Sequence, residues 1–320
     1  MHFTVSSGGI RSVTKTDILA IPLFSDDLGS THLRDVDAAA GGALVALRDI
    51  GEATGQRYSA SLAAGGRLPA DHLLFVGAGA RGDFDRQALL RWGAAVVRRL
   101  AGRRVSRIAI DATSIVAALK GGSPALLAEG GASFGPGLSP NTAESVDPAV
   151  VVVELLVRGA IEGSFHEGID GKSTLDAAPA PVNTVEILLP VGANVRDAAA
   201  GVGRSQIIAD GTVRTKRWSN RPANEMSPLG IAEEARDRAR AVGLRARIVR
   251  RAELERMGAG MLLAVGRGSE NEPCIVALSG GRPGAMDPLG RRLAMVGKGV
   301  DRKSTRLNSS HGYISYAVFC

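Results

Sequence analysis

A lysine between two glycines is the feature of this sequence that points most directly to chemistry. Lys298 lies in the run Val296-Gly297-Lys298-Gly299-Val300, directly after an apolar stretch that predicts a strand. Ligand sites in open α/β sheets lie at the carboxyl ends of strands, and flanking glycines let a ligand or another backbone come close. A lysine held there could lose its proton and offer its amine to a metal ion or a substrate. A solvent-facing lysine in a turn explains the run equally well.

A glycine-rich run after another strand-like segment is a weaker candidate. Residues Gly77–Gly82 fit the spacing G-x-G-x-x-G, which in dinucleotide-binding units places a pyrophosphate at a helix N-terminus. Two features disagree with that function. The third glycine precedes Asp83, which we expect to be the helix N-cap, and no Asp or Glu occurs between Asp85 and Asp111, where the ribose-binding acid belongs. We therefore interpret the run as an ordinary strand-to-helix turn.

The remaining polar clusters favour structural roles. The run Asn220–Asn224 could form a ligand loop, but Pro222 fixes φ and asparagine side chains bond nearby backbone, so we interpret it as a structural turn. The histidines are too far apart for metal-ligand spacing, and we interpret each as a surface or packing residue: His2, His32, His72, His166 and His311. The sequence contains no nucleophile-elbow, P-loop or H-E-x-x-H motif.

The composition is that of a globular chain. The 320 residues are 45% hydrophobic and 22% charged, and this length suits about two domains. The longest apolar stretch, Ala149–Val157, is interrupted by Glu154, whereas a bilayer span needs about 20 apolar residues. The N-terminus has no apolar core typical of a secretory signal. Because Cys274 and Cys320 form neither a disulfide framework nor a zinc-finger spacing, we expect a cytoplasmic location and no membrane partner.

The formal net charge of +7 has two explanations. Of the 39 basic residues 33 are Arg, and Ala and Gly are abundant as well. These residues have GC-rich codons, so genome composition explains the excess, and a nucleic-acid surface is the functional alternative. Basic residues alternate with acids, as in Glu233–Arg240, and aromatic residues that could stack on bases make up only 4% of the chain. We favour the compositional explanation and expect no nucleic-acid partner.

Strands that alternate with helices predict an α/β layered fold. Short apolar runs predict strands at Phe3–Val5, Ile18–Leu23, His72–Val76, Arg107–Ile110 and Val182–Leu189. Apolar residues at three- and four-residue spacing predict a helix from Phe84 to Leu100. Gly41–Leu47 and Pro148–Ile161 also read as helices, although the valines of the second could form a strand. Two stretches read as loops: Gly130–Asp147 and Glu167–Pro181.

A helix at Val195–Ser219 leads into a second α/β unit. Ser227 is a good N-cap and Pro228 suits the first turn of the next helix, which Gly243 ends. Later runs predict strands at Leu244–Val249, Pro273–Ser279 and Arg292–Gly297, and a short helix at Ala252–Met257. The final residues, Asp301–Cys320, begin directly after an apolar strand and hold two of the three tyrosines, so they differ from the rest of the chain.

Three motifs, Trp218–Pro228, Met257–Ser269 and Met295–Val300, follow one another with a characteristic spacing. In that order they resemble the leucyl aminopeptidase (cytosol aminopeptidase) family of metallo-exopeptidases, and the resemblance covers residues 185–300. The first 165 residues resemble the family's N-terminal domain more loosely, through Gly41–Leu44 and Leu73–Gly79. The resemblance implies a macro-like N-terminal α/β domain at residues 1–190 and a linking helix at 195–219. The first part of an α/β/α metallopeptidase catalytic domain would follow at 220–300.

The same resemblance implies removal of N-terminal residues from peptides by two divalent metal ions, Mn or Zn, which activate a water and polarise the scissile carbonyl. The lysine of the family's Lys-Gly-Val motif is a metal ligand, and here it is Lys298. The other ligands are carboxylates, and the catalytic lysine and arginine lie further along the family's sequence. The resemblance therefore assigns no catalytic residue to this chain. It also implies a homo-oligomer, a hexamer in the family, for the full-length protein.

The sequence departs from the family after Val300. The family continues Thr-Phe-Asp, whereas residues 301–303 read Asp-Arg-Lys, so Asp301 stands where Thr is expected and Lys303 where the carboxylate belongs. Residues 301–320 resemble translated sequencing-adapter sequence and predict a tail with no native role. We therefore expect a truncated aminopeptidase that binds no metal and has no activity.

A second function of another class stays open. A non-enzymatic macro-like module could bind a nucleotide or a nucleic acid, and the Gly77–Gly82 turn and the net charge favour it. The three ordered motifs favour the aminopeptidase family more strongly.

Overall fold

The computed structural model describes residues 1–120, 147–165, 182–221 and 225–280, together with Ala294, Val296, Gly297 and Gly299. Contacts divide the chain into two compact units, Met1–Arg214 and Thr215–Cys320. Several predictions fall outside the described residues: the loops at 130–146 and 167–181, Lys298, and the tail Asp301–Cys320.

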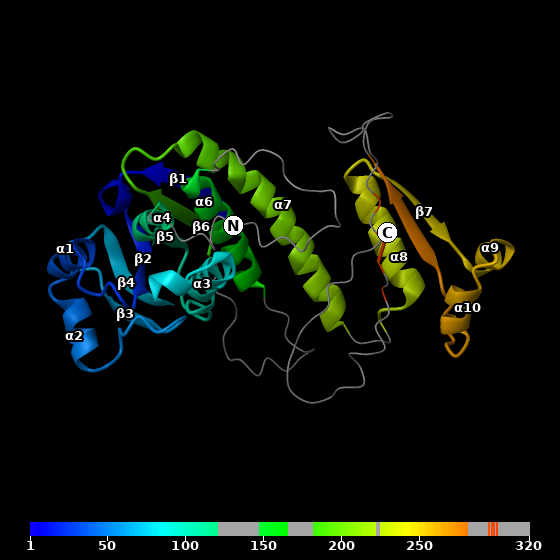
Figure 1. Cartoon of the computed structure of the whole chain (residues 1–320), viewed down its shortest axis with the longest axis horizontal. Helices are drawn as coiled ribbons and strands as arrows, with labels where there is room; N and C mark the ends of the chain where they lie inside the picture. Colours follow the sequence, from blue (N-terminus) through cyan, green and yellow to red (C-terminus); the bar gives the residue numbers. More distant parts are fainter. Residues whose placement is uncertain are drawn as a thin grey trace. The chain divides into compact units, whose positions relative to one another are not determined.

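The first unit is built on a six-stranded sheet (Figure 1) with the order β1-β6-β5-β2-β4-β3. The strands are β1 (His2–Ser7), β2 (Thr16–Phe24), β3 (Ala60–Ala64), β4 (Ala70–Gly79), β5 (Arg107–Asp111) and β6 (Thr184–Leu189). Neighbouring strands are parallel except β3, which is antiparallel to β4. Residues Ile18–Phe24 of β2 are all buried, as expected for a parallel strand covered on both faces.

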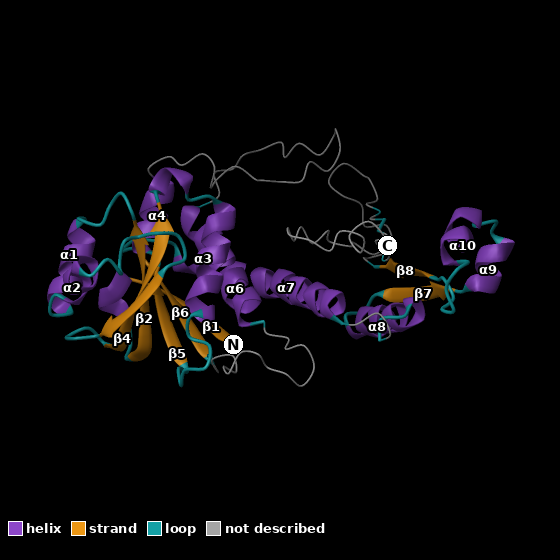
Figure 2. Cartoon of the chain, turned by 90° about the horizontal axis from the view of Figure 1, so that it is seen from below, coloured by secondary structure: helices purple, strands orange, loops and turns teal. Residues whose placement is uncertain are grey.

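Helices cover both faces of this sheet (Figure 2). On one face, α1 (Thr31–Ala39) and α2 (Ala43–Asp49) enclose a core with alternate residues of β2 such as Leu19 and Ile21. On the other face, Ile18 and Ala20 pack in a larger core with three helices: α3 (Arg86–Arg98), α4 (Thr113–Lys120) and α6 (Pro148–Ser164). The predicted α/β fold is confirmed, and the structure shows in addition that the sheet is mainly parallel.

Helix α3 follows the predicted apolar period but begins two residues later than expected. Its N-cap is Asp85, whose Oδ1 accepts the N–H of Ala88 at 2.6 Å, so the prediction of Asp83 as the cap was wrong. Asp83 instead ends a short 3-10 turn, η2 (Arg81–Asp83). Trp92 is fully buried, and its indole N–H donates to the carbonyl of Val76 in β4 at 3.0 Å. This bond anchors α3 to the sheet.

Helices α3 and α6 contact one another through backbone. A Cβ built on Gly159 of α6 would lie 2.3 Å from the carbonyl oxygen of Leu90, and one on Gly163 would lie 2.6 Å from the Cα of Ala94. Such distances leave no room for any side chain. Asp147 caps α6 through the N–H of Ala149 at 2.9 Å, and the valine run that could have been a strand is therefore the buried start of a helix.

The second unit contains a two-stranded antiparallel sheet of β7 (Arg245–Val249) and β8 (Ile275–Ser279). Helix α7 (Val195–Asn220) leads into it, followed by α8 (Pro228–Ala241), α9 (Arg251–Arg256) and α10 (Gly260–Gly266). The predicted cap of α8 is confirmed, because Ser227 Oγ accepts the N–H of Gly230 at 3.1 Å. Ala232 and Ala235 of α8 pack on Val276 of β8 in a small core.

The structure also corrects the element predictions. Strand β3 and helices α1, α4 and α10 were not predicted. Gly41 and Gly42 lie before α2 with φ of 72° and 84°, not inside it. Of the strand predicted at Arg292–Gly297, the described residues Ala294, Val296 and Gly297 are not in a strand, and the others are not described. No helix of the described chain is both long and apolar enough to cross a membrane.

Candidate functional site

Lys298, the predicted metal ligand, lies outside the described residues. Its described neighbours Val296, Gly297 and Gly299 belong to no helix or strand, and Val296 is 88% exposed. Within the described chain, no three His, Cys, Asp or Glu side chains gather closely enough to hold a metal ion. The described residues therefore do not supply the carboxylates that a two-metal centre needs, and the placement of Lys298 at a strand end stays a prediction.

The run Asn220–Asn224 begins at the end of α7. Asn220 is the last residue of that helix. Arg221 follows it, and its Nη1 lies 3.1 Å from Oε2 of Glu234 in α8. Residues 222–224 are not described. The described part of the run thus joins two helices through an ion pair, which agrees with a structural role.

The glycine-rich run Gly77–Gly82 serves close packing. A Cβ on Gly77 would lie 1.8 Å from the carbonyl oxygen of Gln56, and Gly79 has φ of 79°. The N–H of Arg81, which a phosphate would need, donates instead to Oδ2 of Asp26 at 3.0 Å. A pyrophosphate would meet this carboxylate, so the run is the strand-to-helix turn that we predicted.

A topological switch point lies between β2 and β5. These neighbouring parallel strands lead to helices on opposite faces of the sheet, β2 to α1 and β5 to α4. Ligands of open α/β sheets bind outside the carboxyl ends of strands at such points. Here His32 of α1 meets Asp111 at the end of β5, with Nε2 2.6 Å from Oδ2. Asp111 is fully buried, and its Oδ1 accepts the N–H of Thr113 at 3.0 Å.

The hydrogen bond to Asp111 raises the pKa of His32 above its ordinary value. Burial acts in the opposite direction, and the charges of Asp111, Asp35 and Asp27 add to the increase. The pair can therefore hold a proton on a side chain that is 32% exposed. Since His32 makes no other hydrogen bond within the described chain, it is not part of a catalytic triad there. We assign the pair a structural role that joins α1 to the sheet.

Arg81 closes the neighbouring part of this edge. Its guanidinium forms an ion pair with Asp27 and lies over the ring of Phe24, with Cζ 4.6 Å from the ring centroid. The ring of Phe84 meets Phe24 edge-on at a centroid distance of 5.2 Å. The side chains that follow β2 and β4 are thus held against one another.

Sequence reasoning missed the His32–Asp111 pair. It placed His32 among surface or packing residues because no other histidine lies near it in the sequence. The available signal was an acid at the carboxyl end of an apolar strand, Arg107–Asp111. Its partner is 79 positions away, so only the strand order could bring the two together.

Two family models match the chain in order. The N-terminal domain of the cytosol aminopeptidase family matches residues 20–132, and the catalytic domain of that family matches residues 213–303. The first match lies within the first unit, and the second begins at the end of that unit and continues through the second.

Curated relatives are similar over most of the chain. It is 30% identical over 287 residues to a probable cytosol aminopeptidase of Syntrophotalea carbinolica, and 29% identical over 301 residues to one of Thermosynechococcus vestitus. These alignments cover 89% and 91% of this chain but 52% of each relative. The chain therefore spans about half the length of the curated relatives it matches.

Solved structures share the fold. A mutant tomato leucine aminopeptidase matches 87% of this chain and 50% of its own, with a TM-score of 0.66 and 18% identity. The bottromycin maturation enzyme BotP in complex with Mn matches 82% of this chain and 45% of its own, with a TM-score of 0.53 and 20% identity. Because the two domain models match in sequence order and together span more than half of its length, this chain belongs to the cytosol aminopeptidase family.

Proposed function

We propose that this chain supplies the N-terminal domain and the opening of the catalytic domain of a metal-dependent aminopeptidase, which removes N-terminal residues from peptides. The order of the two family matches, residues 20–132 and then residues 213–303, carries the proposal. The boundary between the two compact units falls within the residues of α7, which supports a division at a linking helix. The relatives' name, probable cytosol aminopeptidase, supports peptide substrates and a cytoplasmic location. Assembly of the full-length protein into a hexamer stays a prediction.

Lys298 is the residue for which we propose a metal-binding role in the full-length protein. It lies inside the match to the catalytic-domain model, and the complex of BotP with Mn supports a divalent ion as its partner. Two such ions, when bound, activate a water and polarise the scissile carbonyl. The described residues supply no cluster of acidic ligands, so no step of the reaction is assigned to them.

We further propose that the 320-residue chain is inactive. Lys303 occupies the position where the family has its next carboxylate, and hard divalent ions bind mainly through oxygen ligands. A lysine amine without such neighbours keeps its proton at neutral pH, because its unperturbed pKa is ~10.4. Lys298 by itself therefore binds no divalent ion.

The test is release of leucine from a leucyl anilide by the purified chain with Mn²⁺ or Zn²⁺ added. We expect no turnover above that of the metal salt. Lys298→Ala is the test variant, and Lys15→Ala is its control, because the exposed Lys15 lies only near Asp71, at 3.8 Å. Turnover that a chelator and Lys298→Ala both abolish, and that Lys15→Ala leaves unchanged, would contradict inactivity while supporting the proposed reaction.

A further inference from the structure

One stretch of the first unit concentrates positive charge. Residues 86–110 contain seven arginines and no Lys, Asp or Glu. Their charge of +7 equals the formal net charge of the whole chain. Basic residues alternate with acids in Glu233–Arg240, and residues 238–252 form a second, shorter run with six arginines and no acid. What distinguishes residues 86–110 is therefore not their charge alone but the surface that they form.

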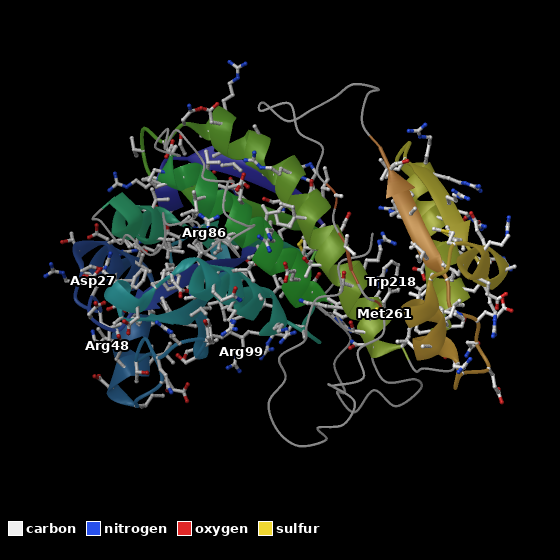
Figure 3. The ribbon with its side chains drawn as sticks, turned by 45° about the vertical axis from the view of Figure 1, so that its right-hand side comes forward. Asp27, Arg48, Arg86, Arg99, Trp218 and Met261 are labelled. Atoms are coloured by element: carbon white, nitrogen blue, oxygen red, sulfur yellow. The ribbon has the colours of Figure 1, made fainter. Side chains whose placement is uncertain are left out.

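Five of these arginines lie at and after the end of α3, in the segment that leads to β5: Arg98, Arg99, Arg103, Arg104 and Arg107. We call them the arginine turn. All five are exposed, and none of their guanidinium groups has a carboxylate oxygen within 4.0 Å in the described chain. Figure 3 shows Arg99 at the opposite end of α3 from Arg86. The turn is thus a surface whose charge the described fold leaves without ion pairs.

A cavity of about 570 Å³ opens beside the arginine turn. It lies at the amino ends of the strands, where Asp17 of β2, His72 of β4 and Ser106 before β5 contribute to its wall together with Arg103 and Arg104. Its apolar wall is formed by Ile18, Leu62 and Val105. Cavities of ~300–1,000 Å³ with an apolar wall and a few polar groups are typical of small-molecule sites.

The two acids of the cavity are already engaged. Oδ2 of Asp17 accepts the N–H groups of Ser106 at 2.7 Å and Arg107 at 2.9 Å. Burial acts to raise the pKa of Asp17, but these backbone bonds and the charges of Arg107 and Lys15 lower it. The carboxylate of Asp71 lies 3.8 Å from the amine of Lys15. Within the described chain, no carboxylate oxygen lies within 4.0 Å of the guanidinium groups of Arg103 and Arg104, and Nη1 of Arg103 donates to the carbonyl of Arg99.

We propose that this cavity binds a small phosphorylated molecule, with its phosphate on Arg103 and Arg104 and its apolar part against Ile18, Leu62 and Val105. The planar fork of arginine matches phosphate oxygens with two hydrogen bonds at once. The hydroxyl oxygen of Ser106 accepts a hydrogen bond from Asn183 Nδ2 at 3.0 Å, so its O–H is left to donate to a phosphate oxygen. The inference is independent of the aminopeptidase activity, since every group that it uses lies in the first unit.

A small molecule fits this place better than a nucleic acid. Proteins that hold single strands stack the bases on aromatic side chains. No Phe, Tyr or Trp is among the described residues that line the cavity, and Trp92, the aromatic residue of the arginine-rich stretch, is fully buried. The wall that faces the charge is aliphatic and suits a hydrocarbon or ring substituent.

The experiment is a titration of the full chain with phenyl phosphate at low ionic strength, slightly above neutral pH, followed by phosphorus NMR. We expect saturable binding that is tighter than that of inorganic phosphate, because the ring contacts the apolar wall. Arg103→Gln/Arg104→Gln should weaken binding about tenfold or more, since charge-assisted hydrogen bonds to phosphate are lost. Arg103→Lys/Arg104→Lys keeps the charge but loses the planar fork, so its affinity for phenyl phosphate should lie between those of the wild type and the double Gln variant.

The matched control is Arg238→Gln/Arg240→Gln on α8, which removes the same charge from two exposed arginines outside the cavity. Equal weakening by the control, or no saturable binding to the wild-type chain, would overturn the proposal. Tighter binding of a duplex oligonucleotide than of phenyl phosphate would assign the surface to nucleic acid and overturn it as well. If the double variant fails to fold, Arg104→Gln replaces it, because the side chain of Arg104 makes no hydrogen bond within the described chain.

Discussion

The two edges of the six-stranded sheet handle charge in opposite ways. At the carboxyl edge the acids are engaged: Asp111 by His32, Asp27 by the guanidinium of Arg81, and Asp26 by the backbone N–H of Arg81. At the amino edge Arg103, Arg104 and Arg107 of the arginine turn are exposed, and their guanidinium groups have no carboxylate partner in the described chain. The guanidinium of Arg99 instead donates to the carbonyl of Tyr58, beside the carboxyl end of β4. Charge at the first edge holds the fold together, whereas charge at the second edge is available to bind something else.

A charged residue at the end of a strand can either hold the fold together or bind a ligand. Ligand sites of α/β sheets are expected at the carboxyl edge, and this chain has its topological switch point there. The charged groups at that point nevertheless pair with one another, although the buried hydroxyls of Thr113 and Ser114 have no hydrogen-bond partner within the described chain. The edge without a switch point has the cavity and the unpaired charge, so in this sheet the electrostatics indicate the binding edge and the topology does not.

The largest effect is expected from Asp111→Ala at the carboxyl edge. Removing one partner of a buried ion pair costs ~3–5 kcal/mol, and we expect about 3 kcal/mol because His32 is partly exposed and can lose its proton. For a unit of this size, that corresponds to a melting temperature lower by roughly 6–12 °C. Thermal denaturation followed by circular dichroism measures it.

Asp71→Ala is the matched control at the other edge. The side chain of Asp71 is 54% exposed, and its ion pair with the exposed Lys15 is long, at 3.8 Å. We expect a change within about 0.5 kcal/mol for it. If Asp111→Ala proved as mild as Asp71→Ala, charge pairing would not distinguish the two edges.

A smaller effect is expected from pH. The folded state binds a proton on His32 more tightly than the unfolded chain does, because the bond to Asp111 raises the pKa of His32. This contribution is fully present below the unfolded pKa of ~6.5 and is lost as pH rises through the folded-state pKa. The free energy of unfolding of the wild type should therefore exceed that of His32→Ala by more at mildly acidic than at alkaline pH.

Urea denaturation across this pH range tests the sign. His72→Ala at the amino edge serves as the control, because the side chain of the exposed His72 makes no hydrogen bond within the described chain. A difference between wild type and His32→Ala that grows toward alkaline pH would show that the pair does not hold a proton.

The smallest effect is expected from Arg98→Gln/Arg104→Gln in the arginine turn. Exposed residues without partners change stability by about 0.5 kcal/mol or less, and removing two like charges favours a slight gain. Arg81→Gln at the carboxyl edge should instead lose about 1 kcal/mol, because it breaks an ion pair and a contact with the ring of Phe24. Chemical denaturation compares the two variants. A loss above about 1 kcal/mol for the arginine-turn variant would mean that the fold uses this charge.

The sequence allowed most of the first unit's elements to be predicted, because buried parallel strands such as Ile18–Leu23 and the helix after Phe84 have strong apolar patterns. Helix α1 was missed because its sequence, Thr31–Ala39, is largely polar. The His32–Asp111 pair could not be predicted, since it depends on which strands are neighbours. The sequence shows that no acid lies between Asp85 and Asp111. Only the structure shows that arginines of this stretch line a cavity. Lys298 is still a prediction from resemblance.

The glycine contact between α3 and α6 has a consequence for how this protein can diverge. Because no side chain fits at Gly159 or Gly163, selection must leave those positions alone. The outer surface of α3 and the arginine turn take no part in this contact, so their residues can be substituted one at a time. Substitutions at the amino edge can therefore change its charge and its cavity without altering the packing of α3 on α6.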